Sequence, residues 1–391
     1  MRRLSIVLIS TLAALLVAEF SLRRWFPVGV AIYELHPDFL HTTRPNSRRI
    51  QAMPESAGGA RSLIVINSAG YRGPELEQSG RPRVAVYGDS LVMGENVAMA
   101  DTFVARLASQ WDNVAEVVNA GASGYGPDQV CLRVEAELES LRPDLIMLVL
   151  CATNDLGDLL RNKLFRLNQG QLVRGHPTLH GSVRGQFERA LRGSSRLALL
   201  RALDHARDDG IEEQATIPGA ASGLIPEYLE QAAWEYRKGV HEGNEVVFSL
   251  LRDVYDADVA VHPQSAMASH KKDLLVAILK RLARACEAHA VPFVCVVVPS
   301  PVDLDPDFLI QVDRELYPDY EPRRLTDTCS EAVRSAGIEV RDLYDLFARN
   351  NPGALFVGAD DIHWNERGMA LAAKDVAAWL RGLEAGAFLA P

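Results

Sequence analysis

A short valine-rich segment at residues 83–87 ends abruptly at Gly88 and is followed at once by Asp89 and Ser90. An apolar run of this length, closed by a turn residue, is typical of a buried strand in a parallel sheet. In open α/β sheets, ligands and chemistry lie at the carboxyl ends of the strands. The segment therefore predicts a parallel sheet that presents a serine at its functional edge.

The same alternation of apolar strand and amphipathic helix continues along the chain. Repeated strand–helix units predict an α/β fold in which helices cover both faces of a parallel sheet. We expect strands at 83–87, 115–119, 145–150, 292–298 and 338–340. We expect helices at about 101–111, 127–141, 271–290, 322–336 and 368–383.

Two further strand ends carry residues suited to ligand binding. The strand at 115–119 leads into a loop with glycines at 121, 124 and 126, where the backbone can approach a ligand and donate N–H groups to it. A tight strand-to-helix loop is the simpler alternative. The strand at 145–150 leads to Asn154, whose side-chain amide can donate to an oxyanion, although asparagine also caps helices well.

A fourth segment near the C-terminus contains Asp360, Asp361 and His363. A carboxylate two or three residues before a histidine can hold the imidazole in one tautomer and make it more basic. Taken alone, such residues are usually solvated loop side chains.

These four segments, in this order, resemble the four sequence blocks of the SGNH (GDSL-type) hydrolase family. The resemblance implies a flavodoxin-like three-layer α/β/α fold of about five parallel strands with a largely helical insertion. It also implies that Ser90 is the nucleophile and His363 the general base. The implied oxyanion hole consists of the backbone N–H groups of Ser90 and Gly124 and the side chain of Asn154.

The chain departs from the family pattern in two places. The third block normally reads Gly-x-Asn-Asp, and Ala152 replaces its glycine. The usual Asp-x-x-His spacing of the last block selects Asp360, whereas a related group of polysaccharide O-acetyltransferases uses Asp-x-His, which would select Asp361. We predict a triad of Ser90, His363 and Asp360.

Such a triad forms an acyl-enzyme, and the four blocks do not decide which acceptor releases it. We predict a serine esterase that removes O-acyl groups from envelope or exported polysaccharide, or from lipid. One alternative is an O-acetyltransferase that uses the same triad on exopolysaccharide. The other is a non-catalytic glycan-binding protein that retains the fold.

The first 26 residues predict a membrane segment. An apolar run from Leu4 to Phe20 is flanked by arginines and interrupted near its end by Glu19. Its length is at the short limit for a transmembrane helix, and its charged start also fits a secretory signal. Because no clean Ala-x-Ala cleavage site follows, we predict an uncleaved single-pass signal anchor with an extracytoplasmic, periplasmic catalytic domain.

The remaining chain divides into four parts. A loop-like extracytoplasmic preamble spans 27–80, with one strand near 62–66 and Arg72 packed on the catalytic domain. The hydrolase domain occupies 81–155 and 271–391. Residues 156–270 form a helical insertion or lid at the catalytic face. Its aromatic residues either contact substrate or belong to the core: Tyr228, Trp234 and Tyr236.

Composition excludes some partners. The net charge of -10 disfavours nucleic-acid binding, which needs a basic surface. The five cysteines contain no Cys-x-x-Cys pair and no disulfide framework, and His-Glu-x-x-His is absent. We therefore predict no metal and no cofactor; the oligomeric state stays open.

Overall fold

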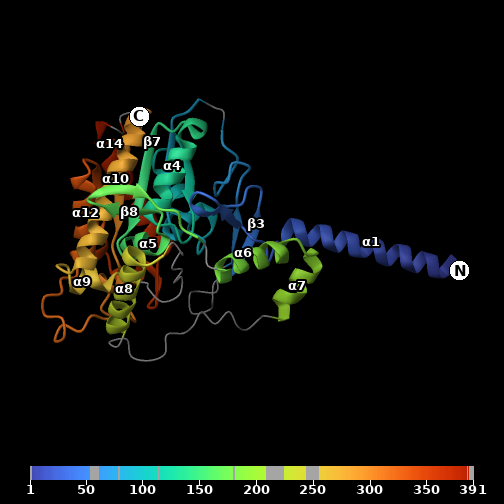
Figure 1. Ribbon diagram of the computed structural model, residues 1–391. Helices are drawn as coiled ribbons and strands as arrows, with labels where there is room; N and C mark the ends of the chain where they lie inside the picture. The colour runs from blue at the N-terminus through green and yellow to red at the C-terminus, as the bar shows by residue number, and fades with distance from the viewer. Residues whose placement is uncertain are drawn as a thin grey trace.

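A five-stranded parallel sheet forms the centre of the computed structural model (Figure 1). Its order is β11-β10-β7-β5-β6, and every neighbouring pair is parallel, so the predicted flavodoxin-like sheet is confirmed. The strands are β5 (Arg83–Gly88), β6 (Glu116–Gly121), β7 (Leu145–Cys151), β10 (Phe293–Val298) and β11 (Glu339–Asp342). The structure describes residues 2–52, 61–77, 80–112, 114–178, 181–207, 224–243, 255–384 and 386.

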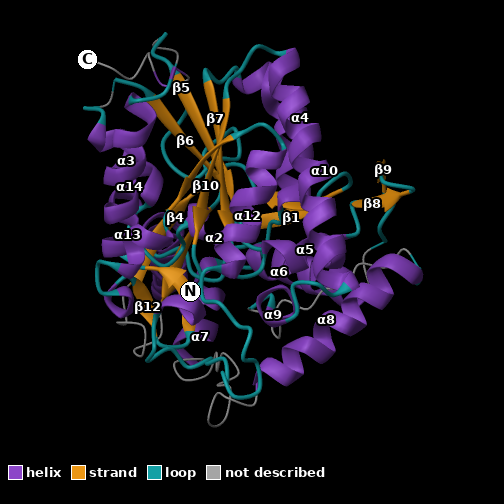
Figure 2. Ribbon diagram, turned by 90° about the vertical axis from the view of Figure 1, so that its left-hand side faces the viewer, coloured by secondary structure: helices purple, strands orange, loops and turns teal. Residues whose placement is uncertain are grey.

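Helices cover both faces of this sheet, which gives the expected three layers (Figure 2). Strand β7 lies in the middle and is buried at all seven positions, as expected of a parallel strand with helices on both sides. One face carries α4 (Pro127–Leu141), α5 (Asp155–Asn162), α10 (Ala266–Ala288) and α12 (Arg324–Ser335). The other carries α3 (Phe103–Gln110), α13 (Tyr344–Ala348) and α14 (Glu366–Arg381).

Short elements at the strand ends build the functional edge. A one-turn helix, α2 (Ser90–Met93), follows β5, and α11 (Pro301–Leu304) follows β10. An antiparallel hairpin of β12 (Phe356–Gly358) and β13 (Asp361–Trp364) precedes α14. Two 3₁₀ turns, at Met99–Asp101 and Pro352–Ala354, complete this region.

The preamble contains more structure than its sequence suggested. The expected strand near 62–66 is present as β4 (Arg61–Val65), but it pairs with β3 (Arg48–Ala52). A second hairpin joins β1 (Tyr33–His36) to β2 (Leu40–Thr43). Strands of four or five residues with mixed polar and apolar side chains show too little periodicity to be recognised without their partners.

The insertion is largely helical, as expected, and opens with a hairpin of β8 (Phe165–Asn168) and β9 (Gln171–Arg174). The helices are α6 (Gly181–Ser194), α7 (Ala198–Arg207), α8 (Leu224–His241) and α9 (Ala257–Val261). Its glycine-rich connector at 219–223 lies outside the described residues. Tyr228 is buried in the main core, Tyr236 packs at its edge and Trp234 is exposed.

At the N-terminus, α1 (Arg2–Trp25) projects away from the rest of the molecule (Figure 1). Its segment Arg3–Trp25 has a mean hydropathy of 2.1 and is not buried against the protein. By length and composition alone this helix can cross a membrane, as a signal sequence also can.

Candidate active site

The serine predicted as nucleophile sits at a sharp strand-to-helix turn. Asp89 caps α2 by accepting a hydrogen bond of 2.8 Å from the backbone N–H of Leu91. Helix α2 lies so close to the strand ends that a Cβ at Gly121 would stand 2.3 Å from the backbone nitrogen of Met93. Glycine at 121 is therefore what allows Ser90 to be presented at the end of β5.

Ser90 lies against His363, although 273 residues separate them. The Ser90 hydroxyl is 2.7 Å from His363 Nε2, and His363 Nδ1 is 2.6 Å from Asp361 Oδ1. A carboxylate cannot donate, so Nδ1 carries the proton and Nε2 accepts from the serine. Burial disfavours the imidazolium, but the Asp361 carboxylate outweighs this effect and raises the pKa of His363.

The carboxylate at His363 is Asp361, so the choice of Asp360 is corrected. Asp361 and His363 both lie on β13, two residues apart. Side chains of a strand alternate between its faces, so these two point to the same side. Asp360 precedes the strand and is exposed, and Asp361 is largely buried. Burial opposes ionisation of Asp361, but the charge of His363 lowers its pKa on balance.

Trp364 holds β13, the strand of His363, against α2, the helix that begins at Ser90. Its indole Nε1 donates to the carbonyl of Leu91 at 3.0 Å, and the ring stacks on Phe103 with centroids 5.3 Å apart. Asn96 Nδ2 donates to the Trp364 carbonyl at 2.8 Å. Trp364, next to His363, is thus bonded to Leu91, next to Ser90. This contact limits how far the His363 imidazole and the Ser90 hydroxyl can separate.

The three expected oxyanion donors follow adjacent strands. Ser90 follows β5, which pairs with β6 on one side and β7 on the other. Gly124 comes three residues after β6 and has φ +75°, a conformation that favours glycine. Asn154 comes three residues after β7, and its buried Oδ1 has no hydrogen-bond partner among the described residues. All three residues therefore lie at one edge of the sheet.

The preamble positions the residue before Gly124. Ser123 N–H donates to the Tyr33 hydroxyl at 3.1 Å, and His41 Nε2 is 2.9 Å from the Ser123 carbonyl. Burial lowers the pKa of His41 to about 4, so this histidine is a neutral donor at neutral pH. Glu95 accepts from the hydroxyls of Tyr33 and Ser123 at 2.6 and 2.7 Å. Sequence reasoning missed these contacts, because single polar residues in short hairpins carry no motif.

Arg72 packs on the catalytic domain, as expected. Its guanidinium is buried and donates to the Val97 carbonyl at 2.9 Å and also to that of Met93. Both carbonyls belong to the segment that follows Ser90. The preamble thus supports the nucleophile turn as well as the glycine loop.

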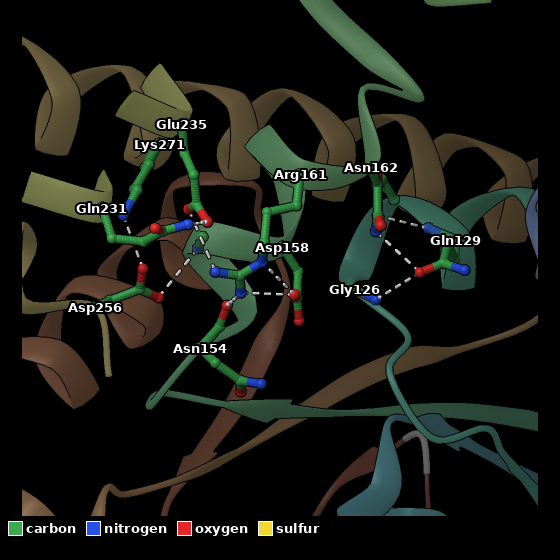
Figure 3. Close-up of polar contacts among 12 residues, drawn as sticks. Gly126, Gln129, Asn154, Asp158, Arg161, Asn162, Gln231, Glu235, Asp256 and Lys271 are labelled. Carbon is green, nitrogen blue, oxygen red and sulfur yellow. Dashed lines mark hydrogen bonds and ion pairs between the residues drawn. The ribbon is translucent and has the colours of Figure 1, made fainter. Parts of the chain in front are cut away.

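A set of buried charges lies behind Asn154 (Figure 3). Arg161 Nη2 donates to the Asn154 carbonyl at 3.2 Å and to Asp158 Oδ1 at 2.6 Å. Its Nη1 is 3.4 Å from Glu235 Oε2, which comes from α8 in the insertion and is fully buried. The Asn154 side chain extends away from these groups in Figure 3.

The same set continues to Lys271, which is fully buried on α10. Its ammonium lies 2.8 Å from Asp256 Oδ1 and 2.6 Å from Asp258 Oδ1. Asp256 Oδ2 also accepts from the Gly157 N–H at 3.1 Å, near the start of α5. The helix that begins after Asn154 is therefore held by the buried charges of Glu235, Asp256 and Lys271.

A second group of contacts in Figure 3 joins the glycine loop to the far end of α5. Gln129 Oε1 accepts from the Gly126 N–H at 3.1 Å and from Asn162 Nδ2 at 2.9 Å. Asn162 Nδ2 also donates to the buried Asp128 at 3.0 Å. The loop that carries Gly124 is thus braced against the end of the helix that begins after Asn154.

Two buried acids lie close to the site. Burial raises the pKa of Asp89 to about 6, although its bond from Leu91 opposes the shift. Asp155 accepts from the Cys151 N–H at 2.7 Å, and burial together with repulsion from Asp89 raises its pKa well above the usual range. The raised pKa of Asp155 favours its neutral form, which limits the negative charge near the edge where an oxyanion would form.

An open parallel sheet with a hydrogen-bonded serine, histidine and aspartate at its carboxyl edge defines a class of acyl-transfer proteins. Residues 255–389 match the family described as the SGNH hydrolase-like domain of the acetyltransferase AlgX. This match covers β10, β11 and the His363 strand. In its C-terminal part the chain is therefore similar to SGNH hydrolase-like proteins, as its sequence blocks indicated.

Solved structures give distant similarities over most of the chain. A catalytic mutant of Axe2, an acetylxylan esterase from Geobacillus stearothermophilus, is 12% identical and has a TM-score of 0.38, covering 78% of this chain and 96% of that one. A putative arylesterase from Agrobacterium tumefaciens is 12% identical with a TM-score of 0.36, covering 77% and 99%. A lipase/acylhydrolase from Enterococcus faecalis is 12% identical with a TM-score of 0.32, covering 77% and 96%. No curated protein matches the chain.

Proposed function

We propose that this protein transfers acyl groups from ester substrates through a covalent acyl-enzyme on Ser90. The observation that carries the proposal is the continuous hydrogen-bonded path from Asp361 through His363 to the Ser90 hydroxyl. A serine hydroxyl is a weak nucleophile at neutral pH and needs such an oriented base. The tautomer that the contacts require, with Nε2 free to accept, is the one that a general base needs.

The geometry supports the following steps. Ser90 Oγ attacks the acyl carbonyl while its proton passes to His363 Nε2. The tetrahedral oxyanion accepts hydrogen bonds from the Ser90 and Gly124 N–H groups and the Asn154 amide. Its collapse breaks the ester bond, and the departing alkoxide takes the proton from His363. An acceptor hydroxyl then loses its proton to His363 and attacks the acyl-enzyme. The bond between Ser90 Oγ and the acyl carbon breaks, Ser90 Oγ takes the proton back from His363, and the acceptor leaves with the acyl group.

For the acceptor, we infer a sugar hydroxyl of a polysaccharide, so that the protein is an O-acetyltransferase. Two observations favour this candidate over the esterase. The family matched by residues 255–389 is described by an acetyltransferase. The aspartate at His363 also has the Asp-x-His spacing that suggested such enzymes from sequence. Hydrolysis, with water as the acceptor, remains the second candidate because the same steps release the acyl group to water.

We further propose that α1 anchors the protein in a membrane, with the catalytic domain outside the cytoplasm. The support is the unburied apolar segment Arg3–Trp25, flanked by arginines at both ends. An acylated polysaccharide or lipid of the cell envelope would meet the active site in that location.

The test uses the full chain in detergent with Ser90→Ala as the matched variant. We expect a fluorophosphonate to label the wild type and not the variant. Turnover of p-nitrophenyl acetate should fall by about 10⁶-fold in Ser90→Ala. Acceleration of p-nitrophenol release by added oligosaccharide, with acetylated sugar as product, identifies the transferase.

Other outcomes separate the candidates. Release of p-nitrophenol that no sugar accelerates, with free acetate as the product, identifies the esterase. A folded wild-type protein that neither reacts with the fluorophosphonate nor turns over ester contradicts the catalytic proposal and favours a glycan-binding role.

A further inference from the structure

Helix α7 of the insertion lies against the proposed membrane anchor (Figure 1). Glu19, the acid within the apolar part of α1, accepts from the N–H groups of Ala198 and Leu199 at 2.9 and 3.0 Å. Arg23, one turn further along α1, donates to the same carboxylate at 2.6 Å. The first turn of α7 thus provides partners for a charge that would otherwise be costly near lipid.

A second contact fixes α7 to the chain that leaves α1. Arg201 is buried, and its Nε donates to the Val28 carbonyl at 3.0 Å. Its Nη1 donates to the carbonyl of Ser194 at 2.9 Å, at the end of α6. Gly29 has φ +62°, and a Cβ at this residue would contact the Arg201 side chain. Helix α7 therefore has a defined position relative to the end of α1.

The opposite side of α7 is apolar and exposed. Leu197, Leu200 and Leu203 recur every three residues and are 53%, 40% and 48% exposed. Ala198 and Arg201 are buried on the side that faces the protein. Outside α1 and α7, the exposed large apolar side chains of the described residues are scattered. None of them forms a stripe of three leucines within seven residues.

The depth of α7 matches that of a helix at a membrane surface. Glu19 precedes Arg23 by four residues, or roughly 6 Å at 1.5 Å per residue. If Arg23 and Arg24 lie among the lipid headgroups, the first turn of α7 lies about one helical turn deeper. Amphipathic helices at membrane surfaces bury their apolar face by about 5–10 Å. The exposed Phe20 and Trp25 on α1 are suited to the same zone.

We propose that α7 is a second membrane contact, in which Leu197, Leu200 and Leu203 enter the boundary between headgroups and acyl chains. The partner is the lipid bilayer itself, and the proposal rests on α1 being a membrane anchor. Two contacts, one across the bilayer and one along its surface, fix the tilt of the catalytic domain. The active site is then held at a set height above the membrane, where a single helix would leave it free to swing.

The test places one fluorescent label on each of three variants of the full chain in phosphatidylcholine vesicles. The five native cysteines are buried, so a new exposed cysteine can be labelled selectively. Leu203→Cys reports on α7, Glu188→Cys on an exposed site of the neighbouring α6, and Leu12→Cys on the middle of α1. An environment-sensitive nitrobenzoxadiazole label is read by its emission and by quenching with doxyl-labelled lipid.

We expect blue-shifted emission and several-fold stronger quenching at 203 than at 188, with strong quenching at 12. Quenching at 203 as weak as at 188, while the label at 12 is quenched, overturns the α7 proposal and leaves the anchor intact. Weak quenching at all three sites overturns the anchor proposal and the α7 proposal with it. The label at 12 therefore distinguishes the two failures.

Discussion

The two sides of the active site are held in different ways. Around Ser90 and His363, the supports are short: an aspartate cap, a glycine contact and the Trp364 indole on the Leu91 carbonyl. Around Asn154, the supports are buried charges: Arg161 on the helix that follows it, and Glu235 and Lys271 from distant parts of the chain. The first side is encoded within its own sequence blocks, and the second depends on the insertion.

This difference changes how the insertion is understood. Glu235 and Asp256 of the insertion contact the helix that follows Asn154, and Lys271 pairs with Asp256 and Asp258. Buried charges stabilise a fold only when each has its partners, so these residues must fold together with the sheet. The insertion is therefore part of the support of the oxyanion side in addition to any role as a lid.

After Ser90→Ala, the largest effect should come from the aspartate proposed for the triad. Asp361→Asn should lower kcat by about 10⁴-fold, because the amide no longer holds His363 in the required tautomer. Asp360→Asn is the matched control, and its activity should stay within about twofold, since Asp360 is exposed and precedes the strand. Ester turnover of the two purified variants decides the assignment; a larger loss in Asp360→Asn would reverse it.

The next effect concerns stability on the Asn154 side. Lys271→Met removes the cation between two buried carboxylates, and breaking such a set typically costs about 3–5 kcal/mol. Lys272→Met is the control, because the neighbouring Lys272 pairs with Glu331 at the surface, where a pair is worth about 0–1 kcal/mol. Denaturant unfolding of both variants gives the comparison. Equal free energies of unfolding would show that the buried charges do not hold this side together.

A smaller effect on rate is expected from the oxyanion side itself. Asn154→Ala should lower kcat by about 10²–10³-fold, as the loss of one oxyanion donor does in other acyl-transfer enzymes. Because its side chain points away from the buried charges, the fold should keep its stability. Acyl-transfer kinetics and unfolding are measured on the same sample. A stability loss that matches the activity loss would mean that Asn154 only caps α5.

The smallest effect is a shift in pH dependence. His363 must be neutral to accept the serine proton, so activity falls as pH drops through its raised pKa. The acidic limb of kcat/KM should have its midpoint above 6.5, the ordinary value for histidine, and Asp361→Asn should move that midpoint down. A midpoint at or below 6.5 in the wild type would show that Asp361 does not raise the basicity of His363.

Stability should change with pH in the opposite direction. A raised histidine pKa contributes stability that is fully present below the unfolded value and is lost as pH rises through the folded value. Burial also raises the pKa of Asp128 and of Asp303 from 3.8 to about 7, so the stability that their neutral forms contribute is lost as pH rises between these two values. The free energy of unfolding should therefore be greater near pH 6 than near pH 8.

Most of the fold could be predicted from sequence because its signals are local. The inner strands β5, β7 and β10 are apolar runs that end in small or polar residues, and burial on both faces requires that composition. Ser90, Gly124 and Asn154 were identified because each follows a predicted strand, and His363 because an aspartate precedes it by two or three residues. The hairpins of the preamble were missed because their pairing, rather than their composition, defines them.

Sequence alone determined the parallel sheet, the edge at which chemistry would occur and most residues gathered there, since strand periodicity and end residues are properties of neighbouring positions. Tertiary structure decided between Asp360 and Asp361, because only the start of β13 shows which carboxylate shares a face with His363. It also decided that Glu19 meets Ala198, 179 residues away, and that Lys271 lies between two aspartates. Such contacts depend on how distant segments pack against each other, and the periodicity of a single sequence does not predict that packing.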